Sequence, residues 1–371
     1  MRTVESPNRR PSRRPHRGAA FAATAALALA AAFALAPAAA AQPESATAGL
    51  VADPGARLPG SLAAEAAASY REAARFPDWS RPVAPEAVDP VLAKRVPAPH
   101  SLPAPGGEAT ITVWPGEVSF EHPAPVVLHA AVDRPRGGGR LALAAVSGEV
   151  VDAAGAVVGR VTYADDGRGA DALGGDGVWT ATFVLPEDRA PALAESFGVR
   201  VTAATAEGES LGITGGFLVS RPHARLTGAY RDRLVDGDLV VSAEIEVTEA
   251  GRFHLAGTLA AVNGDPLAWA QAAAELEPGR HWLDLAFYGL ALRERGVAGP
   301  YRLASLALAT TTAMPNALSD LVEDAHRTRA WPLARFHARP FGNPELLRAA
   351  TRLEADAARA RRTAASAGET P

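Results

Sequence analysis

The chain has 371 residues, with 37 Lys and Arg, 41 Asp and Glu and no cysteine, which gives a formal net charge of −4. The lack of cysteine excludes disulfides, thiolate metal sites and thiol nucleophiles, so hydrophobic cores have to supply the stability. The acidic balance argues against nucleic acid or an anionic membrane as a partner.

Residues 1–41 have the layout of a secretory signal peptide. Six arginines precede an Ala/Leu/Phe run over residues 18–36, and residues 39–41 offer an Ala-x-Ala cleavage site. Residues 12–14 resemble the start of a twin-arginine signal, so both export routes stay open. We expect a periplasmic or extracellular protein with no membrane span after cleavage. Without residues 1–41 the chain has 31 basic and 40 acidic residues, a net charge of −9.

Residues 42–108 predict a short helix followed by a proline-rich strap. The helix is expected over residues 61–75, "SLAAEAAASYREAAR", because alanine favours helix and Phe76-Pro77 follows as a stop. The prolines that come next exclude a continuous helix or strand ladder and favour an extended segment. Phe76 and Trp79 are large apolar groups, so we expect this strap to lie against a domain.

Two arrays of strand-like runs follow, at residues 109–222 and 223–342. In the first array, short apolar runs such as "SFGVRVTAA" are separated by turn residues, a pattern typical of a β-sandwich. The second array predicts a meander, with Asn263-Gly264 as a strong hairpin signal. Residues 343–371 predict a helical or disordered tail. The fold class predicted is mainly β, with two tandem immunoglobulin-like β-sandwich domains.

The loop "DDGRGADALGGDGVWTATF" in the first array brings four acidic residues together. Asp165, Asp166, Asp171 and Asp176 could supply hard oxygen ligands to calcium, although their spacing does not match an EF-hand. The other interpretation is that Asp accepts hydrogen bonds from backbone amides while Gly takes positive φ in tight turns. Calcium and turn chemistry both remain open at this point.

Aromatic residues of the second array offer another candidate site. Trp269, Trp282 and Tyr288 would form a sugar-stacking platform if they lay exposed on one face of a sheet. The simpler interpretation is that they pack in the core of the sandwich. An exposed, coplanar row of these rings would favour carbohydrate binding, and buried rings would favour a plain sandwich.

Two common catalytic motifs are absent. The chain has no His-Glu-x-x-His pair and no phosphate-binding Gly loop followed by Lys. Histidines such as His129, His254 and His281 stand singly in strand-like runs and are interpreted as half-buried strand residues. A hydrolase whose site is assembled from distant residues remains an alternative.

Three stretches taken together resemble a known group of proteins. "YREAARFPDWSRPV", the Asp/Gly loop and "GRFHLAGTLAAVNGDPLAWAQAAAELEPGRHWLDLAFYG" occur in an order similar to that of exported bacterial proteins of the choice-of-anchor X type and related secreted domains of unknown function. The resemblance implies tandem β-sandwich modules, export and no established chemistry. We therefore expect a non-enzymatic binding or scaffolding protein whose partner is a protein or a glycan, with calcium as its candidate stabilising ion.

Overall fold

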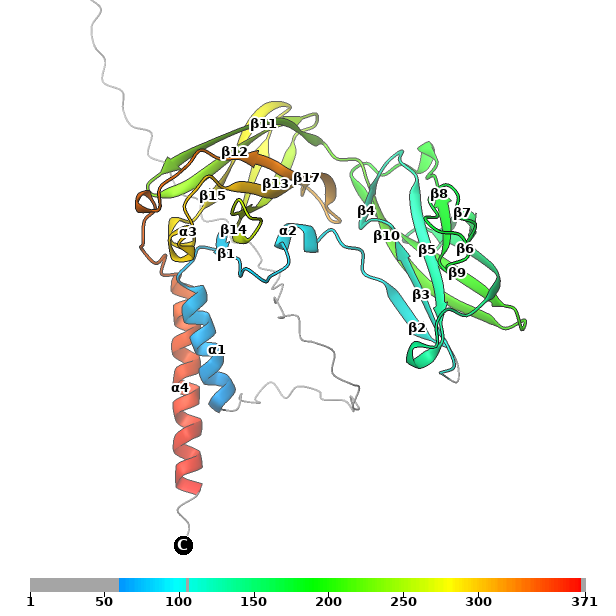
Figure 1. The fold of residues 1–371 in the computed structure, drawn as a ribbon, viewed down its shortest axis with the longest axis horizontal. Helices are drawn as coiled ribbons and strands as arrows, with labels where there is room; N and C mark the ends of the chain where they lie inside the picture. The colour runs from blue at the N-terminus through cyan, green and yellow to red at the C-terminus, as the bar shows by residue number, and fades with distance from the viewer. Residues whose placement is uncertain (1–59, 105–106, 368–371) are drawn as a thin grey trace, which may run out of the picture. The chain divides into compact units, whose positions relative to one another are not determined.

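The computed structural model describes residues 60–104 and 107–367, so the predicted signal peptide at residues 1–41 lies outside the described residues. This part of the chain is mainly β and forms two β-sandwich domains, together with four α-helices (Figure 1). The prediction of a mainly β fold of the sandwich class is confirmed. None of the helices described is long and apolar enough to cross a membrane.

The first sandwich packs a four-stranded sheet against a five-stranded sheet. The four-stranded sheet contains, in spatial order, β2 (His100–Pro103), β3 (Thr110–Pro115), β5 (Val126–Asp133) and β8 (Trp179–Phe183). The five-stranded sheet contains β4 (Ser119–Glu121), β10 (Ser210–Ser220), β9 (Ala194–Thr205), β6 (Leu143–Val151) and β7 (Val157–Thr162). Strands β4 and β10 are parallel, and the other neighbours are antiparallel.

The second sandwich packs a three-stranded sheet against a five-stranded sheet, and all of its paired strands are antiparallel. The three-stranded sheet contains β11 (Ala224–Val235), β12 (Asp238–Val247) and β15 (Gly279–Phe287). The five-stranded sheet contains β1 (Ser80–Pro82), β14 (Pro266–Leu276), β13 (Gly251–Ala260), β16 (Arg302–Thr310) and β17 (Ala317–Arg327).

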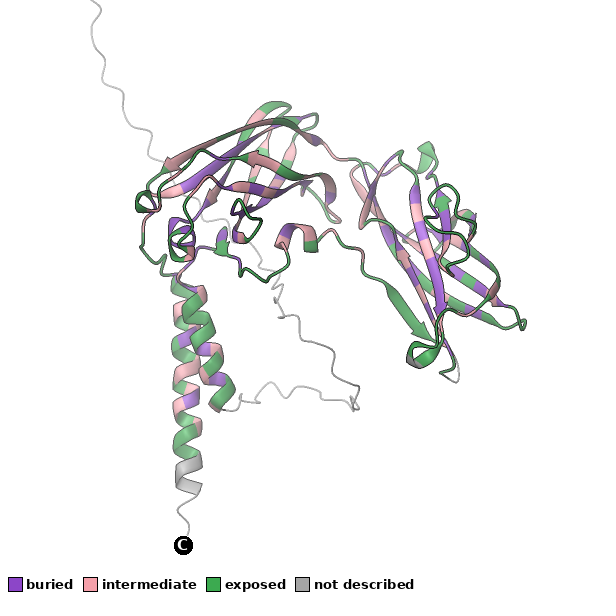
Figure 2. Ribbon diagram, viewed as in Figure 1, coloured by how far each residue is buried: buried purple, intermediate pink, exposed green. Residues whose placement is uncertain are grey.

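Alternating side chains explain how the second sandwich forms its core. In β12 every second residue from Leu239 to Val247 is buried and belongs to one core cluster with Phe253, Phe287 and Tyr301. The purple residues of Figure 2 accordingly lie at alternate positions along many strands. Asn263-Gly264 closes the β13–β14 hairpin, with Gly264 at φ 97°.

The order of strands differs from the meander predicted from the sequence. Strand β14 pairs with β13, whereas β15 belongs to the other sheet and pairs with β12. The chain therefore crosses from one sheet to the other at the short turn after Leu276. It returns to the five-stranded sheet through α3 (Gly289–Arg295), a seven-residue helix between β15 and β16. The prediction treated each turn as a hairpin, because turn residues do not reveal which sheet the next strand joins.

The strap, residues 76–107, contributes short structured pieces between its prolines. Strand β1 adds an edge to the second sandwich by pairing with β14, and β2 adds an edge to the first by pairing with β3. Between them lies α2 (Pro90–Ala93), whose N-cap Asp89 accepts hydrogen bonds from the amides of Val91 and Leu92. Asp89 also accepts a 2.7 Å hydrogen bond from the Thr258 hydroxyl, which holds α2 on the outer face of β13.

The helices α1 (Gly60–Ala73) and α4 (Pro344–Ala367) pack against each other in antiparallel fashion (Figure 1). Gly60 lies beside Ala357 and Ala360, while the carbonyl of Ala74 accepts the amide of Gly342 at the other end of the pair. The buried residues of the interface are alanines, which lets the helix axes approach closely. An exposed two-point ion pair joins Arg71 to Glu354, at 2.5 and 2.7 Å.

Candidate functional site

The Asp/Gly loop of the first sandwich is held by its own aspartates. Asp165 accepts the amides of Gly175 and Gly177 at 2.6 and 3.0 Å, and Asp171, which is only 8% exposed, accepts the amide of Gly167 at 2.6 Å. Asp166 and Asp176 each accept the amide two residues further along. Gly167, Gly169, Gly175 and Gly177 all have positive φ. This is the geometry expected of turn aspartates. Within residues 60–104 and 107–367, no group of three or more His, Asp or Glu is placed to hold a metal ion.

We expect Asp171→Ala to lower the melting temperature of the first sandwich by a few degrees, because the amide of Gly167 loses its buried acceptor at a cost of about 1–2 kcal/mol. Thermal unfolding with calcium and with chelator separates the two interpretations of the loop. An equal loss in both conditions indicates turn chemistry, whereas a loss seen only with calcium indicates a metal site. Asp166→Ala is the matched control, since its exposed carboxylate accepts one local amide.

The three aromatic residues do not lie in one row. Trp269 is in β14 of the five-stranded sheet, whereas Trp282 is in β15 of the three-stranded sheet. Tyr288 is 7% exposed, belongs to the core, and donates its hydroxyl to the carbonyl of Arg339 at 2.8 Å. The Cζ atom of Arg231 lies 4.1 Å from the centroid of the Trp282 ring. A coplanar platform is therefore not formed by these three rings, because the crossing after β14 places them on different sheets.

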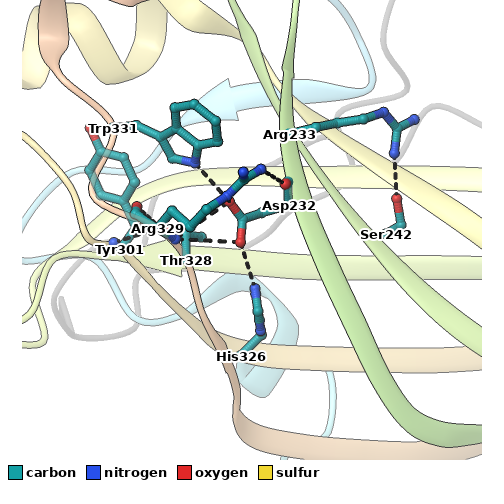
Figure 3. Close-up of polar contacts among 8 residues, drawn as sticks. All are labelled: Asp232, Arg233, Ser242, Tyr301, His326, Thr328, Arg329 and Trp331. Carbon is teal, nitrogen blue, oxygen red and sulfur yellow. Dashed lines mark hydrogen bonds and ion pairs between the residues drawn. The ribbon is translucent and has the colours of Figure 1, made fainter.

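A buried carboxylate joins the two sheets of the second sandwich (Figure 3). Asp232 in β11 has 5% of its side chain exposed, and it accepts hydrogen bonds from His326 Nε2 at 3.0 Å, Trp331 Nε1 at 2.8 Å and Arg329 Nε at 3.1 Å. His326 lies in β17 and the other two donors follow it. We call these four residues the Asp232 cluster. It links the edge strands β11 and β17, one from each sheet.

The surroundings of Asp232 keep its carboxylate charged. Burial by itself raises the pKa of the Asp232 carboxyl, but the hydrogen bonds from His326, Trp331 and Arg329 outweigh it and hold the pKa below its usual range. His326 packs against the Tyr230 ring, and no hydroxyl group within the described ranges is hydrogen-bonded to it. Because donors of the chain itself occupy the carboxylate, we interpret the Asp232 cluster as a structural clamp.

A second polar link crosses the outer face of the three-stranded sheet. The hydroxyl of Ser242, which is fully buried, donates to Asp284 Oδ1 at 2.5 Å and accepts from Arg233 at 2.7 Å (Figure 3 shows the Arg233 contact). Burial alone raises the pKa of the Asp284 carboxyl, but the hydrogen bonds from Ser242 and Arg233 outweigh it and hold the pKa low. The serine is covered and both its neighbours are paired, which favours a role in cross-strand stability over one as a nucleophile.

A small pocket lies between α2 and the outer face of the five-stranded sheet, and we call it the strap pocket. Its volume is about 100 Å³. It is lined by Val91, Lys94, Arg95, His254, Ala256, Trp269, Ala307, Leu308, Ala309 and Leu318. These residues come from the strap and from β13, β14, β16 and β17, and the hydrogen bond from Thr258 to Asp89 helps to hold α2 on the sheet.

The polar groups of the strap pocket are mainly hydrogen-bond donors. Trp269 Nε1 is buried and has no acceptor within the described part of the chain. Lys94 is exposed and its Nζ lies 5.5 Å from the centroid of the Trp269 ring, while Arg95 is half-buried and donates to the carbonyl of Leu308 at 3.3 Å. Burial lowers the pKa of Arg95, although the charge of Asp320 opposes this effect.

His254 is held in one orientation beside this pocket. Gln271 donates its amide nitrogen to the carbonyl of Asp78 at 3.2 Å, so its oxygen faces His254 Nε2 at 3.0 Å and accepts the hydrogen carried there. Burial lowers the pKa of His254, and the positive charges of Lys94 and Arg252 lower it further, against the effect of the Gln271 hydrogen bond. The ring is therefore neutral at pH 7.

Neither the Asp232 cluster nor the strap pocket was predicted from the sequence, because each brings together residues that are far apart in the chain. Asp232 and His326 are 94 residues apart, and Lys94 and Trp269 meet only because the strap folds back over the sheet. His254 was interpreted as a half-buried strand residue, which describes its place in β13 but not the polar partners around it. The chain has a single lysine, Lys94, but nothing in the sequence indicates that it lies beside Trp269.

The second sandwich matches a described protein family. Residues 223–318, from just before β11 to the start of β17, match the C-terminal domain of a family described as a domain of unknown function (DUF4785). This match supports the part of the sequence resemblance that concerns domains of unknown function. No curated protein matches the chain.

Several solved structures are similar to parts of the chain. A crystal structure of a DUF4785 family protein from Legionella pneumophila has 17% sequence identity and a TM-score of 0.42, covering 61% of this chain and 58% of that one. CopC from Methylosinus trichosporium OB3b has 18% identity and a TM-score of 0.18 over 28% of this chain and 85% of its own. A Salmonella alpha-2-macroglobulin mutant has 16% identity and a TM-score of 0.31, covering 63% of this chain and 15% of its own. The chain thus spans 58% of the length of the Legionella structure.

Proposed function

We propose that this chain is an exported, non-enzymatic binding protein built of two β-sandwich modules, and that the strap pocket is its ligand site. The observation that carries the proposal is the indole N–H of Trp269, which is buried and lacks an acceptor in the described part of the chain, on a residue that lines the strap pocket. A buried donor without a partner costs about 1–3 kcal/mol, and a ligand that supplies an acceptor recovers this cost.

Three further observations support the proposal. Export is supported by the signal-peptide pattern of residues 1–41 and by the resemblance to choice-of-anchor X proteins. A binding role is supported by the pocket itself, because convergent polar groups in an otherwise apolar concavity are typical of ligand sites. The non-enzymatic part is supported by the Asp232 cluster, where the carboxylate beside His326 is already occupied by structural donors. Stabilisation by calcium is a separate proposal, which the Asp171→Ala experiment tests.

The test uses the tryptophan indoles of the ¹⁵N-labelled protein. The chain has six tryptophans, and the Nε1–H resonance of Trp269 is assigned as the one missing from the Trp269→Phe variant. We expect small acceptor-bearing molecules to shift this resonance in a saturable manner, while the resonance of Trp282, on the other sheet, stays in place. If no molecule of an acceptor-rich fragment collection moves the Trp269 resonance, the strap pocket is not a ligand site.

A further inference from the structure

The size of the strap pocket limits what can enter it. With about 30 Å³ of liquid volume per water molecule, a pocket of about 100 Å³ holds three or four heavy atoms. Most of its lining is aliphatic, from residues such as Val91, Ala256 and Leu308. A ligand therefore needs a short apolar group that fits against these side chains, and the rest of a larger ligand would stay outside.

The charges around the pocket favour an anion. Lys94 and Arg95 both line it, no acidic side chain is among the lining residues, and the Trp269 N–H is a further donor. The carboxylates of Asp320 and Glu117 interact with Arg95 and partly offset its positive charge, whereas Lys94 has no ion-pair partner in the described ranges. These two cationic lining residues stand out in a chain with more acidic than basic residues.

The charged side chain over the Trp269 ring is a lysine, in a chain whose other basic residues are arginine. All but one of the 37 basic residues are arginine, yet the position over the Trp269 ring has lysine. An ammonium group is a compact charge with three rotatable donors, whereas a guanidinium is a wide planar fork. The pocket lining therefore includes a small cation that can follow a small anion, beside the guanidinium of Arg95, which donates to the carbonyl of Leu308.

We propose that the strap pocket binds a carboxylate attached to a short aliphatic group, with the carboxylate between Lys94 and the Trp269 indole N–H and the aliphatic group against Val91 and Leu308. This inference rests on the function proposed above and adds the class of ligand. The same chemistry has two sources, a free short-chain acid and the terminal carboxylate of a peptide that ends in a small apolar residue.

Butyrate and butyramide are the matched probes, because they have the same carbon chain and differ in charge. We expect butyrate to shift the Trp269 indole resonance at millimolar concentration and butyramide to bind at least fivefold more weakly. Lys94→Gln should weaken butyrate binding about fivefold, while Lys94→Arg, which keeps the charge but replaces the compact ammonium with a planar guanidinium, should weaken it less than Lys94→Gln does. Because Lys94 is exposed, neither variant is expected to change the folding of the domain.

The outcomes separate this inference from the proposed function. If butyramide binds as well as butyrate, or Lys94→Gln leaves butyrate binding unchanged, the carboxylate inference is wrong while the pocket remains a ligand site. If neither probe moves the Trp269 resonance and the fragment collection also fails, both proposals are wrong. The peptide N-acetyl-Ala-Ala, compared with its C-terminal amide, distinguishes the sources: tighter binding than butyrate assigns the site to a peptide terminus, and equal or weaker binding assigns it to a free acid.

Discussion

Asp232→Ala is expected to destabilise the second sandwich by about 3 kcal/mol, measured as a lower urea midpoint at unchanged m-value. The substitution leaves the ring of His326 and the indole of Trp331 without their acceptor at the seam between β11 and β17. Removing one partner of a buried ion pair costs about 3–5 kcal/mol, and the lower end applies because the Arg329 side chain is 64% exposed and regains water.

Glu246→Ala is the matched control for this prediction. Glu246 lies in β12 of the same sheet and pairs with Arg280 at 3.8 Å, with both side chains more than half exposed. Its loss should change the stability by less than about 1 kcal/mol. Equal effects of the two substitutions would contradict the interpretation of the Asp232 cluster as a clamp.

The contribution of Asp232 should also depend on pH. The pKa of its carboxyl is lower in the folded state than in the unfolded chain, so the native state binds fewer protons and gains stability above the unfolded pKa of about 3.9. This stability is lost as the pH falls below about 5 and through the depressed pKa. The difference in unfolding free energy between wild type and Asp232→Ala should therefore be full at pH 7 and shrink towards pH 3.

Gly289→Ala is expected to have an effect of similar size, about 3 kcal/mol or more, for a steric reason. A Cβ at position 289 would lie 2.1 Å from the carbonyl oxygen of Gly237 and 3.1 Å from the amide nitrogen of His337. Both neighbours are backbone atoms, so they cannot move aside as a flexible side chain could. The amide of Gly289 also donates to Asp238 Oδ1 at 2.7 Å, which in turn accepts from His337 Nε2 at 2.9 Å.

Gly212→Ala in β10 of the first sandwich is the control, because the nearest atom to its added Cβ is 3.9 Å away. It should change the stability by less than about 1 kcal/mol. Differential scanning calorimetry of both variants is the measurement. A Gly289→Ala protein that melts within two degrees of wild type would show that the backbone around residue 237 can relax.

Local patterns were sufficient to predict most of the strands. The alternation in "SFGVRVTAA" corresponds to β9, and Asn263-Gly264 closes a hairpin because both residues tolerate positive φ. Strands β1 and β2 were not predicted, since proline breaks the alternating pattern and their pairing depends on edges that other segments provide. The crossing between β14 and β15 was also missed, because only packing decides which sheet a strand joins.

The candidate sites were harder to predict, because each depends on contacts between distant residues. The carboxylates of the Asp/Gly loop act locally, and their turn geometry was one of the two interpretations drawn from the sequence. For Trp269, in contrast, the two interpretations were an exposed sugar-stacking row and core packing, and the residue instead lines a pocket covered by α2. No spacing in the sequence indicates that Asp89 holds α2 there through Thr258.

The antiparallel pairing of α1 and α4 determines how this part of the chain would respond to mechanical tension. Gly60 and Ala360 lie side by side at the same end of the helix pair, so a force that pulls them apart would separate the helices one turn at a time, like a zipper. Small alanine contacts and the exposed Arg71–Glu354 ion pair resist this separation along the pair, and the hydrogen bond from Gly342 to Ala74 resists it at the far end. The helix pair would therefore extend at low force and absorb the load before it reached the strands of either sandwich.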